Sequence, residues 1–154
     1  MSIMMVLAAA LALCAARPAA AASNLMLAPD LSFTDDSSAN FPITGKELAG
    51  GTISSGRPTV IFFGTSHCWN TNREAERLVA LYPRYRDRFN FIVVDLNAVG
   101  SGQRQLVASY YSGYIPTLAI FNARGELVYD KAGETAGGRG DTSGLEKLFQ
   151  SALR

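Results

Sequence analysis

The sequence predicts an α/β fold, a central mixed β-sheet flanked by helices, and two observations support this prediction. Apolar runs rich in β-branched and aromatic residues recur at 59–63, 91–96 and 117–121, which is typical of buried strands. Segments with apolar residues at helical spacing follow the first two runs, at 69–82 and 103–111. The order strand, helix, strand predicts parallel strands joined by a right-handed crossover.

The remaining elements are expected in the following places. Before residue 57 the pattern is weakest, with an edge strand at 31–33 and a helical turn at 44–48. Pro83 is expected to end the first long helix. After the third strand we expect a hairpin turn at 122–125, a fourth strand at 126–129, a flexible glycine-rich loop at 133–144 and a closing amphipathic helix at 145–153.

Residues 1–22 have the pattern of a cleaved secretory signal. An apolar stretch from 3 to 16 precedes Ala20-Ala21-Ala22, which resembles a signal-peptidase site, and the stretch is short for a membrane span. The alternative is lipidation at Cys14, which would attach the protein to a membrane, although the preceding Leu13 is larger than such processing prefers. We therefore expect a periplasmic or secreted protein with an irregular N-terminal extension at 23–56 and one folded domain at 57–154.

Composition excludes several classes of function. The chain has 14 basic and 13 acidic residues, and loss of Arg17 with the signal would leave no net charge, so no nucleic-acid partner is expected. Without Cys14 the chain keeps one cysteine, Cys68, and one histidine. This is too few for a metal site of these ligands, and residues 137–140 lack the Lys-Ser/Thr of a phosphate-binding loop. We expect neither a metal nor another cofactor.

Cys68 is the residue on which the functional prediction depends. The first strand ends at Gly64, and helical spacing begins at about Thr71, so this thiol lies where a strand gives way to a helix. Unpaired backbone N–H groups and the positive end of the helix dipole both favour the thiolate there.

The pattern from 59 to 153 resembles thioredoxin-like proteins. Phe63 precedes Cys68 by five residues, Val94-Asp95 ends the next strand, and the segment 113–126 resembles the family's cis-proline region. The resemblance implies a thioredoxin-like fold with a cis Ile115–Pro116 bond beside Cys68. It also implies that the backbone of Ile115 pairs with an extended substrate peptide.

The sequence also departs from this family. The motif is Cys-x-x-Thr, so Thr71 replaces the resolving cysteine, and His67 replaces the tryptophan before the first cysteine. Phe62 and Phe91 stand where the family has a buried aspartate and its lysine partner. A chain with no second thiol to deprotonate has no use for that buried pair, whose desolvation is unfavourable.

Three side chains near Cys68 are candidates for its chemistry. The Thr71 hydroxyl is placed to donate a hydrogen bond to the thiolate, or else to its own helix backbone. His67 is either a proton acceptor for the thiol or a residue at the rim of the site. Trp69 either docks a peptide or packs against Pro116 or the loop 97–102.

We therefore expect a monothiol thiol–disulfide oxidoreductase acting on protein or small-molecule thiols and disulfides, because a single thiol can attack a disulfide but cannot resolve the product. The alternative is a non-redox module that binds peptides or proteins on the same fold. A third hypothesis is a peroxidase, because Thr65-x-x-Cys68 resembles the peroxiredoxin motif; the proline of that motif would fall on Ile61.

Overall fold

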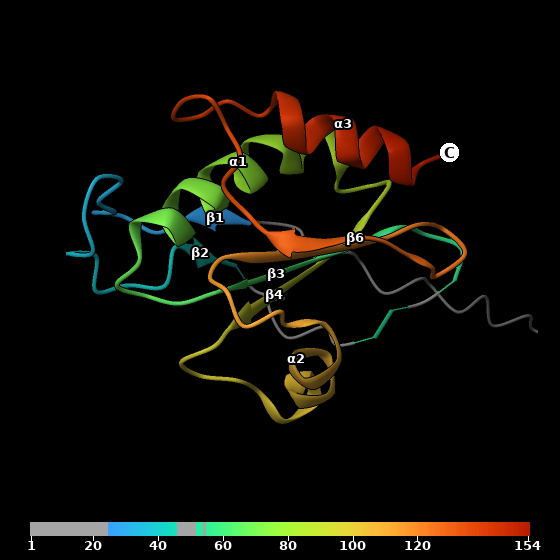
Figure 1. The fold of residues 1–154 in the computed structure, drawn as a ribbon, viewed down its shortest axis with the longest axis horizontal. Coiled ribbons are helices and arrows are strands. Elements are labelled where there is room, and N and C mark those ends of the chain that lie inside the picture. Colours follow the sequence, from blue (N-terminus) through green and yellow to red (C-terminus); the bar gives the residue numbers. More distant parts are fainter. Residues whose placement is uncertain (1–24, 46–51, 54) are drawn as a thin grey trace, which may run out of the picture.

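A four-stranded mixed sheet in the order β4–β3–β5–β6 forms the centre of the molecule (Figure 1). The structure is a computed structural model that describes residues 25–45, 52–53 and 55–154. The predicted signal segment and Cys14 lie outside the described residues. In chain order the elements are β1 (Met26–Leu27), β2 (Ile43–Thr44), β3 (Thr59–Gly64), α1 (Trp69–Tyr85), β4 (Asn90–Asp95), the 3-10 helix η1 (Ser101–Gln103), α2 (Arg104–Tyr110), β5 (Thr117–Phe121), β6 (Leu127–Ala132) and α3 (Ser143–Ala152).

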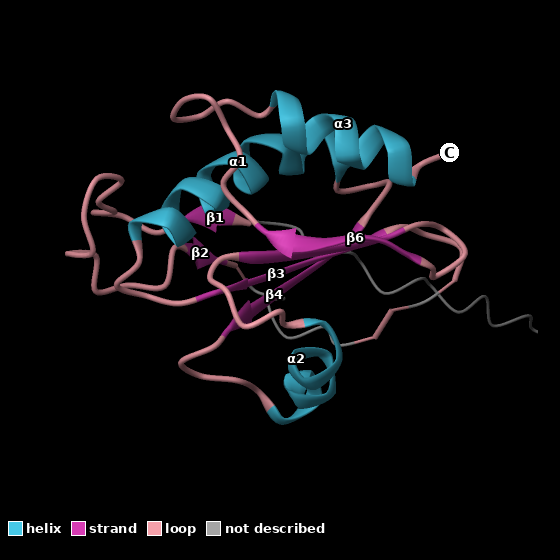
Figure 2. Cartoon of the chain, in the orientation of Figure 1, coloured by secondary structure: helices cyan, strands magenta, loops and turns pink. Residues whose placement is uncertain are grey.

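Helices cover both faces of this sheet. α1 and α3 lie on one face and α2 lies on the other, as Figure 2 shows. Side chains of β3 alternate between the two layers, as the two-residue period of a strand requires. Val60 and Phe62 pack with α1 and α3, whereas Ile61 and Phe63 pack with α2. All six residues of β3 are buried, which explains why its sequence is apolar almost without interruption.

The register of β3 places the thiol loop and the proline loop at the same end of the sheet. β3 pairs in parallel with β4, which confirms the predicted strand–helix–strand unit. β3 also pairs antiparallel with β5, and Phe63 lies opposite Thr117. The loop 65–68 follows β3, and Pro116 directly precedes β5. Both therefore lie at the same end of the sheet.

Three expectations about the first helix and the N-terminal extension are wrong. α1 continues through Pro83 to Tyr85. Pro83 lies in the last turn with its ring exposed, so it removes a single backbone donor near the helix end instead of breaking the helix interior. The predicted edge strand at 31–33 does not form. Instead, β1 pairs antiparallel with β2, and Thr44, predicted to begin a helical turn, belongs to β2; residues 46–48 of that turn lie outside the described residues.

The other boundaries differ by a few residues. β6 runs to Ala132, three residues beyond the predicted end, because it continues to pair with β5 as far as Thr117. η1 begins within the loop 97–102 and includes Gln103, where the predicted helix 103–111 was expected to start. Within the described ranges, none of the helices combines the length and apolar character that crossing a bilayer requires.

Candidate functional site

Cys68 occupies the N-cap position of α1. Its backbone is extended, with φ −148° and ψ 104°, and its side chain makes no capping hydrogen bond. The residue is partly exposed, and it forms no disulfide. β3 and α1 thus hold a free, partly exposed cysteine at the end of the sheet that also carries Pro116.

The sequence suggested that the backbone N–H groups beside Cys68 are unpaired, but two of them have hydrogen-bond partners. The N–H of Trp69, the first residue of α1, donates a hydrogen bond of 2.9 Å to Oδ1 of Asp36. The N–H of His67 donates to the carbonyl oxygen of Ser38 at 2.9 Å. A carboxylate from the N-terminal extension therefore caps the thiol-bearing helix, and α1 itself has no acidic residue in its first turn.

Asp36 belongs to a segment, residues 32–38, that docks along the thiol end of α1. Asn72 is fully buried, and its Nδ2 donates to the carbonyl of Ser32 at 2.6 Å and to the hydroxyl of Ser38 at 2.9 Å. Arg73 donates through Nε to the carbonyl of Phe33 at 3.0 Å. We call residues 32–38 the capping segment. Sequence reasoning missed it, although the absence of an acid in the first turn of α1 next to an Asp-Ser-rich stretch was an available signal.

Thr71, in place of a resolving cysteine, is fully buried. Its methyl group points to Gly64, since a Cβ built on that glycine would lie 2.5 Å from Thr71 Cγ2. The Oγ1 atom of Thr71 finds no hydrogen-bond partner among the described residues. As the third residue of α1, Thr71 is on the side of the helix that reaches back to the N-cap.

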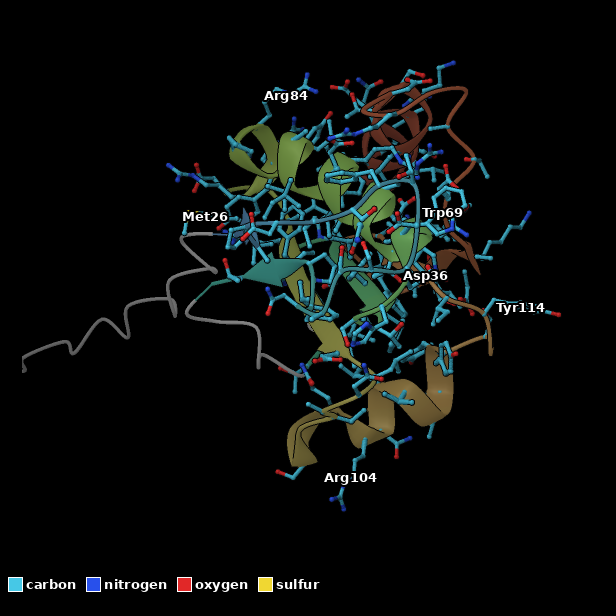
Figure 3. All side chains as sticks on the ribbon, turned by 90° about the vertical axis from the view of Figure 1, so that its left-hand side faces the viewer. Met26, Asp36, Trp69, Arg84, Arg104 and Tyr114 are labelled. Atoms are coloured by element: carbon cyan, nitrogen blue, oxygen red, sulfur yellow. The ribbon has the colours of Figure 1, made fainter. Side chains whose placement is uncertain are left out.

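His67 and Trp69 flank Cys68 in the sequence, but no hydrogen bond joins either side chain to its thiol. His67 is exposed with a φ of 53°, a left-handed conformation in which histidine is enriched. No hydrogen bond joins its ring to Cys68 or to another described residue. The guanidinium of Arg73 lies over the half-buried Trp69 ring, 4.6 Å from its centroid, and Figure 3 shows Trp69 near Asp36 at this end of α1.

The proline loop has the predicted geometry. The Ile115–Pro116 bond is cis. Thr117 Oγ1 donates to the carbonyl of Tyr114 and shares a hydrogen bond of 2.8 Å with Ser112, and Gly133 N–H donates to the Pro116 carbonyl at 2.8 Å. These contacts fix the loop on both sides of the proline.

The tip of this loop is apolar and open. Tyr114 is 70% exposed and Ile115 39% exposed, and in Figure 3 Tyr114 extends away from the body of the molecule. Within the described residues, the backbone of Ile115 makes no hydrogen bond. The N–H and C=O of Ile115 are therefore unpaired among the described residues, at the end of the sheet that also carries the loop 65–68.

A separate cavity of about 90 Å³ lies between α1, β5, β6 and α3. Glu74 and Arg77 line it and form a buried ion pair of 2.7 Å, and Glu74 also accepts the N–H of Glu134 at 2.7 Å. Cys68 and Pro116 do not line this cavity. Glu74, Arg77 and Glu134 contact one another and Asp141 accepts the N–H of Ser143, so we assign the cavity to the packing of α1 against the loop after β6.

No cluster of three potential metal ligands of the His, Cys, Asp or Glu type occurs in the described part of the chain. Phe62 and Phe91, at the positions of the family's aspartate and lysine, lie in the core between the sheet, α1 and α3. Phe62 packs edge-on against Phe41 with ring centroids 6.3 Å apart, and Phe91 packs against Tyr82 at 5.0 Å.

Comparisons with known proteins agree with this architecture. No family model matches the sequence, and no curated protein sequence matches it. Among solved structures, an uncharacterised thioredoxin-like protein from Clostridium perfringens aligns with a TM-score of 0.52 at 20% identity, over 64% of this chain and 73% of that one. A Fasciola hepatica thioredoxin aligns with a TM-score of 0.50 at 19% identity, over 64% and 84%.

A structure described as a malarial protein also aligns, with a TM-score of 0.50 at 16% identity, over 64% of this chain and 99% of that one. All three alignments have low sequence identity, so they concern the fold and not the chemistry of the site. Together with the sheet order, the helix layers and the cis proline, they identify this chain as a protein with a thioredoxin-like fold.

Proposed function

We propose that this protein performs monothiol thiol–disulfide exchange through Cys68. The observation that carries the proposal is the position of a free, partly exposed cysteine at the N-cap of α1. It lies at the same end of the sheet as a cis-proline loop in which the backbone of Ile115 makes no hydrogen bond to a described residue. Cys68 attacks one sulfur of a disulfide and forms a mixed disulfide, while the electron pair of the broken S–S bond leaves on the other sulfur as a thiolate. A thiol from solution or from a partner then releases Cys68.

Thr71 and His67 have different proposed roles. The Thr71 hydroxyl has no other partner among the described residues, so it is available to donate to the thiolate once Cys68 ionises. His67 is exposed, and its ring makes no bond to Cys68 in this structure. We therefore place it at the rim, where its ring is free to accept a proton from Cys68 or from the incoming thiol.

Trp69, Ile115 and Pro116 form the proposed peptide contact. The open backbone of Ile115 pairs with an extended chain, and the exposed Tyr114 offers apolar area to its side chains. Such a site fits a protein disulfide as substrate better than a small molecule alone, because main-chain pairing needs several residues.

Trapping tests the exchange reaction. In a Cys14→Ser background, incubation with a peptide disulfide should give one stable mixed disulfide at Cys68, detected by intact mass, and Cys68→Ser should give none. Thr71→Cys should supply an internal resolving thiol, so the variant should reduce insulin catalytically in the presence of dithiothreitol and exceed the parent. Absence of any adduct on the native parent would contradict the proposal.

A second candidate is a peptide-binding module without redox turnover. It is favoured by the Thr71 that stands where a dithiol motif has its second cysteine, combined with the open backbone at Ile115. A Cys68→Ala variant that binds the same peptides as the parent, together with a parent whose thiol reacts only after unfolding, would support this function over exchange.

We also propose that residues 1–22 direct export, which would place the mature chain in the periplasm or outside the cell. The apolar stretch and Ala20-Ala21-Ala22 support this proposal. Amino-terminal sequencing of protein recovered from the cell envelope or the medium should begin at Ser23. Recovery in the lipid fraction with Cys14 as the first residue would instead support lipidation.

A further inference from the structure

The capping segment brings negative charge to a thiol whose own helix carries none nearby. The carboxylate of Asp36 accepts the N–H of Trp69 at 2.9 Å. This nitrogen is bonded to the carbonyl carbon of Cys68, so the carboxylate lies at most about 8 Å from the sulfur. No ion pair neutralises Asp36 among the described residues.

The other charged groups near the N-terminus of α1 leave the net charge around Cys68 negative. Asp35 is fully exposed, and hydrogen bonds from Ser37 and Ser32 hold its pKa below the ordinary value. Arg73 is the first basic residue along α1, and its charge is paired with Glu134 at 3.4 Å; its guanidinium also contacts the Phe33 carbonyl and the Trp69 ring.

We propose that Asp36 sets the charge of the disulfide that Cys68 accepts, which favours cationic or neutral partners over anionic ones. The inference rests on the proposed exchange reaction and adds its substrate class: peptides whose disulfide is flanked by neutral or basic residues. An anionic disulfide must approach Asp36, and its leaving thiolate adds a further negative charge beside it. A cationic disulfide is attracted to the same carboxylate and its leaving group is partly neutralised.

The capping segment is held firmly enough for its charge to act from a fixed position. Asn72 and Arg73 bind three of its main-chain or side-chain oxygens. The guanidinium of Arg139 lies 3.7 Å from the centroid of the Phe33 ring and pairs with Glu76 at 3.0 Å. The segment is therefore secured from both α1 and the loop after β6.

Three small disulfides of similar size test the proposal: cystamine, bis(2-hydroxyethyl) disulfide and dithiodiglycolate, which carry two positive, no and two negative charges. Rates are measured on the full chain with Cys14→Ser. The ratio of the cystamine rate to the dithiodiglycolate rate in this parent is divided by the same ratio in Asp36→Asn, which cancels the intrinsic reactivities of the reagents. We expect this quotient to be about five, as for charges separated by roughly 8–10 Å near a surface.

Asparagine keeps an oxygen that accepts the Trp69 N–H, so the capping segment should stay docked. Asp87→Asn is the matched control, because it removes the same charge from an exposed carboxylate beyond the far end of α1, and it should leave the ratio unchanged. Salt gives an independent measurement on the parent: raising sodium chloride from 20 to 500 mM should reduce the ratio severalfold.

Equal ratios in Asp36→Asn and the parent, with all three reagents still forming adducts on Cys68, would overturn the role of Asp36 and leave the exchange function intact. A salt-independent ratio would also overturn it. If none of the reagents reacts with the native parent, the exchange function itself fails.

Discussion

Two adjacent buried positions of α1, Thr71 and Asn72, use their polar groups in opposite ways. Both are 0% exposed. The Thr71 hydroxyl has no partner among the described residues, whereas the Asn72 amide nitrogen makes two hydrogen bonds to the capping segment. Thr71, at the position of the resolving cysteine in a dithiol protein, thus makes no side-chain hydrogen bond to a described residue. Its neighbour Asn72 holds the capping segment, which lies next to Cys68.

One turn further along α1, the buried side chain of Glu74, like that of Asn72, holds an irregular segment against the helix. Its Oε2 accepts bonds from Arg77 and from the backbone N–H of Glu134, both at 2.7 Å. Gly133 leaves room for this contact, since a Cβ there would lie 2.9 Å from Glu74 Oε2 and would displace the carboxylate. Polar side chains of α1 therefore stabilise its contacts with two irregular segments, and none of them substitutes for the missing thiol.

The largest effect is expected from breaking the pair of Glu74 with Arg77. Arg77→Met should reduce the free energy of unfolding by about 3–5 kcal/mol, because it leaves the buried Glu74 carboxylate without its charged partner. Urea denaturation measures this loss. Adding Glu74→Gln should recover part of it, and a loss below about 1 kcal/mol in the single variant would show that the pair does not anchor the loop.

Asn72→Ala should reduce the free energy of unfolding by about 1–3 kcal/mol, because two buried hydrogen bonds to Ser32 and Ser38 are lost. Limited proteolysis should then cut within the capping segment. Asn70→Ala is the matched control: Oδ1 lacks a partner in both asparagines, but only Asn72 also makes two hydrogen bonds through Nδ2, whereas no hydrogen bond joins the Asn70 side chain to another described residue. Equal stability of the two variants would show that the hydrogen bonds of Asn72 to the capping segment do not stabilise the fold.

Thr71→Val should raise the free energy of unfolding by about 1 kcal/mol, because it removes a hydroxyl that is buried without a hydrogen-bond partner among the described residues. The rate of Cys68 alkylation by iodoacetamide should nevertheless fall about threefold at pH 7, if the hydroxyl donates to the thiolate. Thr71→Ser keeps the donor and should retain the rate. An unchanged rate in the valine variant would leave Thr71 with a packing role only.

The smallest effect concerns Asp130 on β6, whose Oδ1 is another buried oxygen without a partner among the described residues. Burial raises the pKa of Asp130 above its ordinary value, so the folded chain holds this proton more tightly than the unfolded chain does. Stability from this group is present at low pH and is lost as pH rises through the raised pKa. Asp130→Asn should therefore stabilise the protein at pH 7 relative to the parent, and urea denaturation at pH 4 should show a smaller difference.

The sheet and its cis proline were predictable because they depend on local patterns. The apolar runs of β3, β4 and β5 are buried on both faces, and the residues around Pro116 follow a family motif. The N-terminal strands were not predictable, because β1 and β2 have two residues each and form only by pairing across a loop.

The position of Cys68 at the start of α1 and the cis bond at Pro116 were predictable, but their surroundings were not. Asp36 caps Trp69 across 33 positions of sequence, and no periodicity indicates such a contact. The continuation of α1 through Pro83 was missed for a related reason: packing of Tyr82 and Tyr85 in the core stabilises the last turn more than the proline disfavours it.

The most direct test of this account is a thiol titration of the native Cys14→Ser chain with 4,4′-dithiodipyridine, a neutral disulfide. The account predicts release of one thiopyridone per chain in native buffer, with a stable adduct on Cys68 and no second release. A thiol that stays silent until urea unfolds the chain would contradict the central claim that Cys68 is presented for exchange.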